Sequence, residues 1–283
     1  MSDYLFDASL VSAYDVHHGL LSRNHIYTTG VLILDSGGYE ARPVFDPGEP
    51  YGDDRPGLDW TLYDYQHALG DLEPLSRLVV VSFDCVGPFS DQIRLARSLF
   101  DQHKDYASDF LCKPTSVGAT FIDVDSLITS IDEVASFDVL GITEKELGES
   151  VVSRCRKLIR IREALQRHGH ETPIHVFGCL DPMTILAYFL CGADIFDGLA
   201  WLRFAFVDGM PIYHASSTIL KGQWAEFDQD VVAAHRAQNL KELRDQARAM
   251  RRYSLQHDLA ELARTPAWAP QVLDLIRDAG LKI

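Results

Sequence analysis

Three aspartates each follow a short apolar run in this sequence, and their placement is the first sign of chemistry. Asp35 follows the run LIL, Asp84 follows VVSF, and Asp197 follows IF. In a parallel α/β barrel the carboxyl ends of all strands open on one face, and that face holds the active site. Carboxylates far apart in sequence would therefore meet there. One of them could act as a nucleophile and another as a general acid and base.

Each aspartate also has an ordinary structural explanation, because Asp commonly caps helices and starts turns. Gly37 and Gly38 follow Asp35-Ser36, and two glycines let the backbone approach a ligand closely or adopt a positive φ. Gly-Gly turns are common, so this pair alone identifies no site. The coincidence of three strand-end aspartates is what favours a site over three separate turns.

The elements that would position these residues can be read from the hydropathy pattern. Short apolar runs alternate with longer amphipathic segments, which predicts βα units around a parallel sheet. The expected strands are 31–34, 78–83, 137–142, 174–177 and 193–196, and the expected helices are about 91–103, 144–167 and 181–190, followed by a charged helical pattern from residue 229 onward. Asp181 can cap the third helix, Pro182 suits its first position, and Gly192 can end it.

The chain of 283 residues has the length of one large α/β domain. We expect a single TIM-barrel domain over residues 1–283, with a barrel core at about 25–225 and a C-terminal helical segment at about 228–283. Residues 41–59 are rich in Pro, Gly and Asp and predict a long surface loop, and loops of that length are often functional. No internal repeat or linker divides the sequence.

Composition limits the possible functions. The formal charge of −15 argues against a general nucleic-acid coat, because nonspecific affinity comes mainly from Lys and Arg on phosphates. The five cysteines form no C-x-x-C pair, which makes a disulfide framework or a Cys-rich zinc site unlikely from spacing alone. We expect a cytoplasmic protein, since the sequence shows neither a signal-peptide pattern nor an apolar run of membrane-spanning length.

Four segments together resemble a known family. Residues 35–40 (DSGGYE) resemble the DSGGFQ motif of the tRNA-guanine transglycosylase family, and Phe83-Asp84 resembles its FDE segment. Residues 137–141 resemble the strand that leads into the family's GGLAVGE loop. Residues 178–182 and 192–197, with Arg203 after them, resemble its GvG-pedl and GiDmFDcvmPTR segment. The four matches follow the family's order.

The resemblance implies a (β/α)8 barrel that exchanges guanine in a polynucleotide for a 7-deazaguanine base, with retained configuration. By motif, Asp197 would be the nucleophile that attacks the ribose, and Asp35 the general acid and base. Asp84 would recognise the purine through N1–H and the exocyclic amine, and the Gly141 backbone would contact the base. The other substrate-binding positions that the resemblance implies are Ser36, Gly37, Gly38, Ile142, Lys113 and Arg203. Such an enzyme must take its target base out of the stack.

The sequence also departs from that family. The family's zinc cluster has no counterpart, because no cysteine follows Tyr213 and Gln238 stands where an HNL motif has His. We therefore expect no structural zinc and no cofactor. Because the zinc subdomain helps to dock tRNA in the family, we favour DNA slightly over tRNA. Cys112-Lys113-Pro114 replaces a Gln-Gly pair that contacts the base, and the sequence leaves open whether queuine, preQ1 or preQ0 is inserted.

Two other functions stay open at this stage. The chain could be a noncatalytic accessory subunit of such an enzyme, although aspartates at both catalytic positions disfavour this. It could also be an unrelated barrel hydrolase of small molecules, which its acidity suits. A partner protein could supply affinity for the polynucleotide, and the resemblance makes a homodimer possible.

Three further features have a structural and a functional interpretation each. The basic residues from Lys241 to Arg252 could track a phosphate backbone, but a solvated helix face is the commoner explanation. His168, His170 and His175 could suggest a metal site, although a polar loop is favoured. Cys179 follows an expected strand and could approach the pocket, but a small buried residue is the default interpretation.

Overall fold

The computed structural model describes residues 8–21, 29–38, 59–72, 77–179, 181–262 and 268–281, without the side chain of residue 260. Most of the predicted loop at 41–59 lies outside these residues, as do Tyr39 and Glu40 of the DSGGYE segment. The chain forms two compact units. The first consists of Met1–Leu147 and Glu163–His175, and the second of Gly148–Arg162 and Val176–Ile283.

One sheet runs through the fold with its strands in sequence order. Its strands are β1 (Ala8–Ser12), β2 (Val31–Asp35), β3 (Leu78–Val81), β4 (Ala107–Cys112), β5 (Val139–Thr143), β6 (Ile174–Phe177) and β7 (Ile195–Phe196). The pairings from β1 to β5 are parallel. The order never reverses, unlike that of a doubly wound sheet. The predicted α/β class with a parallel sheet is therefore confirmed.

Closure into an eight-stranded barrel remains a prediction. Within the described ranges this sheet has seven strands, whereas β8 (Ala205–Val207) and β9 (Met210–Ile212) form a separate antiparallel pair.

In the described ranges no helix is both long and apolar enough to cross a membrane.

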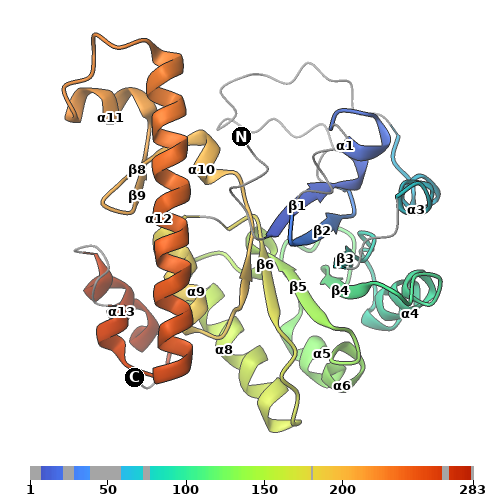
Figure 1. Cartoon of the computed structure of the whole chain (residues 1–283). Helices are drawn as coiled ribbons and strands as arrows, with labels where there is room; N and C mark the ends of the chain where they lie inside the picture. Colours follow the sequence, from blue (N-terminus) through green and yellow to red (C-terminus); the bar gives the residue numbers. More distant parts are fainter. Residues whose placement is uncertain are drawn as a thin grey trace. The chain divides into compact units, whose positions relative to one another are not determined.

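Helices connect the strands. The first unit contains α1 (Ala13–His17), α3 (Leu62–Gly70), α4 (Phe89–Phe100), α5 (Val124–Thr129), α6 (Ile131–Val134) and α7 (Glu144–Leu147), and α8 (Val151–Arg167) runs through both units. The second unit contains α9 (Pro182–Leu190), α10 (Ala200–Arg203), α11 (His214–Leu220), α12 (Asp228–Gln256), the short η2 (Leu259–Glu261) and α13 (Ala269–Asp278). Within the second unit, α9 contacts both α12, the longest helix, and α13 (Figure 1).

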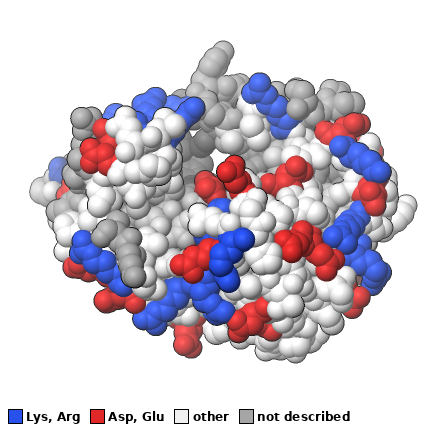
Figure 2. Space-filling view, turned by 90° about the horizontal axis from the view of Figure 1, so that it is seen from below, with Lys and Arg blue, Asp and Glu red and all other residues white. Residues whose placement is uncertain are grey.

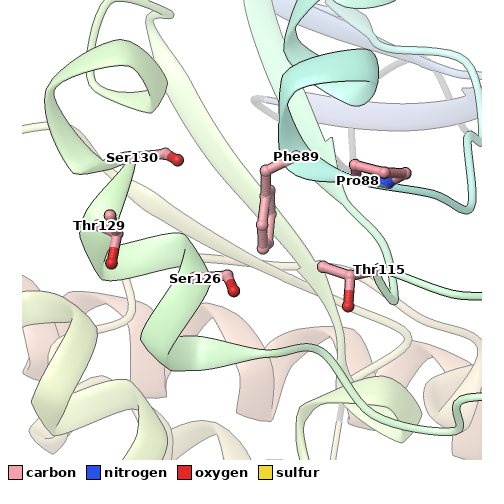
Figure 3. A pocket seen from close by; sticks show the side chains of 6 residues that line it. All are labelled: Pro88, Phe89, Thr115, Ser126, Thr129 and Ser130. Atoms are coloured by element: carbon pink, nitrogen blue, oxygen red, sulfur yellow. The ribbon is translucent and has the colours of Figure 1, made fainter.

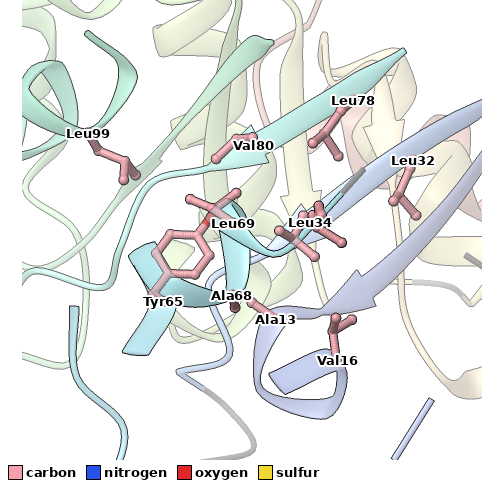
Figure 4. Close-up of a cluster of buried hydrophobic side chains, with 11 residues drawn as sticks. Ala13, Val16, Leu32, Leu34, Tyr65, Ala68, Leu69, Leu78, Val80 and Leu99 are labelled. Atoms are coloured by element: carbon pink, nitrogen blue, oxygen red, sulfur yellow. The ribbon is translucent and has the colours of Figure 1, made fainter. Parts of the chain in front are cut away.

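A hydrophobic core supports the strand ends of the first unit. Helix α3 presents Tyr65, Ala68 and Leu69, whose spacing of three and four residues places them on one face. They pack with side chains of β2 and β3 such as Leu34 and Val80 (Figure 4). A capping box starts this helix, because the Thr61 side chain accepts from the Asp64 N–H and the Asp64 carboxylate accepts from the Thr61 N–H. The start of α3 is thus fixed close to the end of β2.

The predicted punctuation of α9 is confirmed. The Asp181 side chain accepts a hydrogen bond from the Met183 N–H, Pro182 lies in the first turn, and Gly192 follows the helix with a φ of +101°. Burial raises the pKa of the Asp181 carboxyl, against the lowering effect of the bond from Met183.

Several predicted elements have other bounds in the structure. The helix expected over 144–167 is divided into α7 and α8, because Gly148 separates them and the Ser150 side chain accepts from the Ser153 N–H at the start of α8. Strand β3 ends at Val81, two residues before the expected end. Strand β4 was not predicted, because Ser108 and Asp109 interrupt its apolar pattern.

Candidate active site

Asp35 is the last residue of β2 and starts a tight turn. Its Oδ2 accepts a hydrogen bond from the Gly37 N–H at 3.1 Å, and the Ser36 Oγ accepts one from the Gly38 N–H at 3.4 Å. Gly37 has a φ of +82°, which a residue with a side chain rarely adopts. The turn explanation for Asp35 is therefore correct, and the same bond fixes the orientation of its carboxylate.

The turn brings Gly38 against Asp84, which lies 48 residues from Ser36 in the sequence. A Cβ added at Gly38 would lie 2.5 Å from Asp84 Oδ2, so a larger residue at this position would displace the carboxylate from its present orientation. The Ser36 Oγ also donates to Asp84 Oδ1 at 3.5 Å. Helix α4 begins after Pro88 without a side-chain cap, so Asp84 is not a helix cap.

A buried cation lies beside Asp84. Lys113 directly follows β4, and its Nζ is 3.7 Å from Asp84 Oδ2 and 2.8 Å from Glu146 Oε1. The Lys113 side chain is only 6% exposed, and those of Asp84 and Glu146 are 16% and 19% exposed. We call Ser36, Gly38, Asp84, Lys113 and Glu146 the Asp84 cluster. With one cation and two carboxylates it has a formal charge of −1.

The backbone of Lys113 is held by a buried glutamine. The Gln92 Oε1 accepts from the Lys113 N–H at 3.0 Å, and its Nε2 donates to the Lys113 carbonyl at 2.9 Å. The same Nε2 donates to the Gly87 carbonyl at 2.7 Å. Gln92 is 3% exposed and belongs to α4. Helix α4 therefore ties the segment after β3 to the segment after β4.

The predicted positions on β5 lie next to this cluster. Gly141 and Ile142 pair in register with Leu111 and Cys112 of β4, directly before Lys113. Ile142 is fully buried in the sheet. Burial also raises the pKa of the Cys112 thiol well above its usual value, which keeps this thiol protonated and unreactive.

Asp197 and Arg203 belong to the second unit. Asp197 directly follows β7, and its Oδ1 accepts a hydrogen bond from the Gly178 N–H at 3.1 Å, just after β6. Helix α10, which ends at Arg203, has no side-chain cap, so Asp197 is not its cap. The buried Cys179 has its Sγ 3.3 Å from the Thr184 Oγ1, a contact within the turn that starts α9.

The histidine segment does not gather into one site. His168 Nδ1 and His170 Nε2 lie 3.0 Å and 2.8 Å from Asp132 Oδ1 in an exposed loop, and these hydrogen bonds lower the pKa of the Asp132 carboxyl. His175 is instead fully buried on β6, with its Nδ1 2.7 Å from Asp109 Oδ2. Among the described residues, no group of three His, Cys, Asp or Glu side chains is arranged to hold a metal ion.

Gln238, which the resemblance aligns with the histidine of the HNL motif, is exposed, and its Nε2 donates to Glu242 Oε1 at 3.0 Å. The next residue, Asn239, is fully buried and has a structural role. Its side chain accepts from the Phe206 N–H and donates to the carbonyls of Trp201 and Phe204, which ties α12 to α10 and β8.

A shallow pocket of about 380 Å³ lies elsewhere in the first unit (Figure 3). It is lined by Pro88, Phe89, Thr115, Ser126, Thr129 and Ser130, none of which is a predicted site residue. Two of its hydroxyl groups are bonded locally, since Ser126 donates to Asp123 and Thr129 to the Asp125 carbonyl. The lining carries no charged side chain, so we assign it no chemistry.

The structure thus brings together the predicted residues Asp35, Ser36, Gly37, Gly38, Asp84 and Lys113, with the β5 positions beside them. The sequence did not predict Glu146, Gln92 or Trp60 as site residues. Glu146 falls in the EKEL segment directly after β5, and a charged residue at that edge of the sheet was the available signal. Gln92 and Trp60 had no such signal.

The comparisons with protein families and with curated proteins identify no relative of this chain. No protein-family model matches the chain, and a search of curated proteins gives no match either.

Proposed function

We propose that this chain is a transglycosylase (a pentosyltransferase) that exchanges guanine in a polynucleotide for a 7-deazaguanine base, with DNA favoured over tRNA. The sheet would then belong to a (β/α)8 barrel of the tRNA-guanine transglycosylase type, with C-terminal helices and no zinc subdomain. The exchange replaces one base by another at the same carbon, so it involves no net oxidation and requires no redox cofactor.

The observation that carries the proposal is the Asp84 cluster. The Watson–Crick edge of guanine presents the O6 acceptor beside the N1–H and N2–H donors. A carboxylate offers two acceptors, and the Lys113 ammonium, 3.7 Å from Asp84, offers a donor beside them. Adenine presents a donor where guanine has O6, so it would place this donor against the ammonium. The cluster therefore suits a guanine-type base.

The proposed chemistry divides one displacement into two steps. A carboxylate oxygen of Asp197 attacks C1′ and forms a C–O bond while the C1′–N9 bond breaks. The bonding electrons leave with N9, and the departing guanine takes a proton from Asp35. The incoming base then gives its N9 proton to Asp35 and attacks C1′, which releases Asp197. Two inversions at C1′ give net retention, as in retaining glycosidases.

The geometry around the two carboxylates supports these roles. Each has one oxygen that accepts from a glycine N–H at 3.1 Å, which holds the group in one orientation. Each comes from the carboxyl end of a strand, where active sites of parallel α/β folds are found. DNA is favoured because the tRNA-docking zinc subdomain has no ligands here.

Incorporation of labelled guanine or preQ0 into DNA and into tRNA tests the proposal. We expect label in one polymer with the wild type, and a loss of at least a thousandfold with Asp197→Asn, because the nucleophile is removed. Asp194→Asn is the matched control, since Asp194 lies three residues earlier and pairs with Arg162. Asp84→Asn should raise the KM for the free base.

The outcomes separate the rival functions. A covalent polymer–protein adduct, trapped without incoming base and absent in Asp197→Asn, would support a catalytic subunit over an accessory one. Folded protein that labels neither polymer would overturn the proposal for the isolated chain. Activity on a small molecule without any polynucleotide would instead support the barrel hydrolase.

A further inference from the structure

Trp60 lies against the turn that carries Asp35. Its indole Nε1 donates to the Ser36 carbonyl oxygen at 2.7 Å, across 24 residues of sequence. A Cβ added at Gly37 would lie 3.0 Å from this Nε1 and 2.9 Å from the backbone nitrogen of Tyr14. The turn is therefore enclosed between Trp60 and Tyr14.

Trp60 is itself firmly held. Its ring packs edge-on against Tyr14 at 5.5 Å and against His17 at 5.4 Å, measured between ring centroids. Tyr14 is only 4% exposed. The next residue, Thr61, is the N-cap of α3, whose capping box fixes the backbone at this point. Helices α1 and α3 thus hold the indole in place.

The Ser36–Gly37 peptide is fixed at both ends. Its carbonyl oxygen accepts from Trp60, and its N–H donates to Asp35 Oδ2 at 3.1 Å. A peptide unit is planar, so its C=O and N–H point in opposite directions and rotate together. Rotation of this peptide would break both bonds. The Trp60 indole N–H therefore fixes the Ser36–Gly37 peptide, and with it the Gly37 N–H that orients the Asp35 carboxylate.

We propose that Trp60 is a positioning residue for Asp35. It touches neither the base nor the ribose in this role, and acts through the Ser36–Gly37 peptide. As far as catalysis is concerned, the inference rests on the proposed function, because Asp35 is the acid and base only in that reaction. The effect on the turn itself is independent of the reaction.

The test compares two indole hydrogen bonds. Trp60→Phe keeps a ring but removes the N–H donor, and Trp268→Phe is the matched control because Trp268 Nε1 donates to the Asp208 carbonyl, also at 2.7 Å. We expect Trp60→Phe to lower kcat of base exchange about five- to tenfold, the equivalent of one hydrogen bond, with an unchanged KM for the base. Trp268→Phe should leave kcat unchanged.

A second measurement needs no activity. In protein labelled with ¹⁵N-glycine, amide hydrogen exchange at Gly37 and Gly38 should be several-fold faster in Trp60→Phe than in the wild type and in Trp268→Phe. If Trp60→Phe does not fold, benzothienylalanine at position 60 keeps the ring shape and replaces the N–H by sulfur.

The two measurements separate failures of the two proposals. If the wild type exchanges no base, the proposed function fails while amide exchange still tests the turn. The positioning role would be overturned if the variant that lacks the Trp60 indole N–H showed wild-type rates of amide hydrogen exchange at Gly37 and Gly38. A kcat loss of similar size in Trp268→Phe would also overturn it.

Discussion

Asp35 ends β2 and Asp84 lies three residues after β3, and their surroundings give them different chemical properties. Asp35 accepts one bond from a backbone N–H in its own turn, which orients the carboxylate without neutralising it. Asp84 faces the Lys113 ammonium and the glycine turn. These surroundings suit a carboxylate that accepts hydrogen bonds from a ligand. The roles proposed for the two aspartates, proton transfer for Asp35 and base recognition for Asp84, thus follow from their neighbours rather than from residue type.

The two glycines of the turn should respond differently to alanine. In Gly38→Ala the new methyl group would collide with the far end of Asp84, which can rotate away, so we expect a change of at most about 1 kcal/mol in stability. The displaced carboxylate should raise the KM for the base at least tenfold. Gly37→Ala meets the Tyr14 backbone at a φ of +82° and should cost about 1–3 kcal/mol.

Urea unfolding and steady-state kinetics of both variants check this prediction. Gly70→Ala is the control, because an added Cβ there meets no atom within 4 Å. Wild-type kinetics in Gly38→Ala would mean that Asp84 does not contact the base.

At the scale of elements, a fully buried pair connects two strands of the first unit. Asp109 on β4 and His175 on β6 are 0% exposed, and β5 lies between their strands in the sheet order. Such a pair contributes little net stability, but removal of one partner leaves the other in a medium that solvates it poorly. The contact therefore favours one arrangement of these strands.

Single substitutions of this pair should be costly. We expect Asp109→Leu or His175→Leu to lower the free energy of unfolding by about 3–5 kcal/mol, and the double variant to lose less than the sum of the two. The exposed contact between Asp132 and His168 provides the comparison, since Asp132→Leu should change the free energy of unfolding far less than either buried substitution. Urea unfolding measures all four variants. Additive losses at Asp109 and His175 would contradict the coupling.

The contact between α11 and α12 should make the second unit sensitive to acid. His214 Nδ1 and His235 Nδ1 are 3.0 Å apart, and His235 Nε2 is 3.0 Å from the buried Ser217 hydroxyl. Burial lowers the pKa of both imidazoles, so the folded protein favours their neutral forms. On acidification the unfolded chain binds protons first, and stability falls as pH decreases below about 6.5.

Thermal unfolding between pH 8 and pH 5 checks this sign. The Tm of the wild type should fall over the acid part of this range, and His235→Gln should show a smaller fall because it lacks one of the two groups. The same slope of Tm against pH in wild type and variant would show that this pair does not cause the acid sensitivity.

At the scale of the whole molecule, acidic and basic side chains are interspersed on the face that Figure 2 shows. The basic face of α12 follows this pattern. Asp245 pairs with Lys241 and Arg248, each at 3.2 Å, and these cations lower the pKa of its carboxyl. Glu261 pairs with Arg252 in the same way. Carboxylates thus neutralise much of the charge, which favours a solvated face over a phosphate track.

Charge reversal on α12 should therefore have little effect on polynucleotide binding. For Arg248→Glu combined with Arg251→Glu we expect less than a twofold change in Kd for a labelled oligonucleotide. Fluorescence anisotropy at 50 and 200 mM salt would measure this. A loss of at least tenfold, with a reduced salt dependence, would instead identify α12 as a phosphate contact.

The sequence by itself determined the α/β class, the strands around Asp35 and Asp197, and the cap of α9, because hydropathy period and capping are local properties. It also located Asp35 and Asp197 at strand ends. Only the tertiary structure decided which side chains meet. Trp60 reaches Ser36 across 24 residues, and Asp109 reaches His175 across 66, which separates this histidine from His168 and His170. Such contacts depend on strand register and on the placement of helices, and no local pattern in the sequence encodes them.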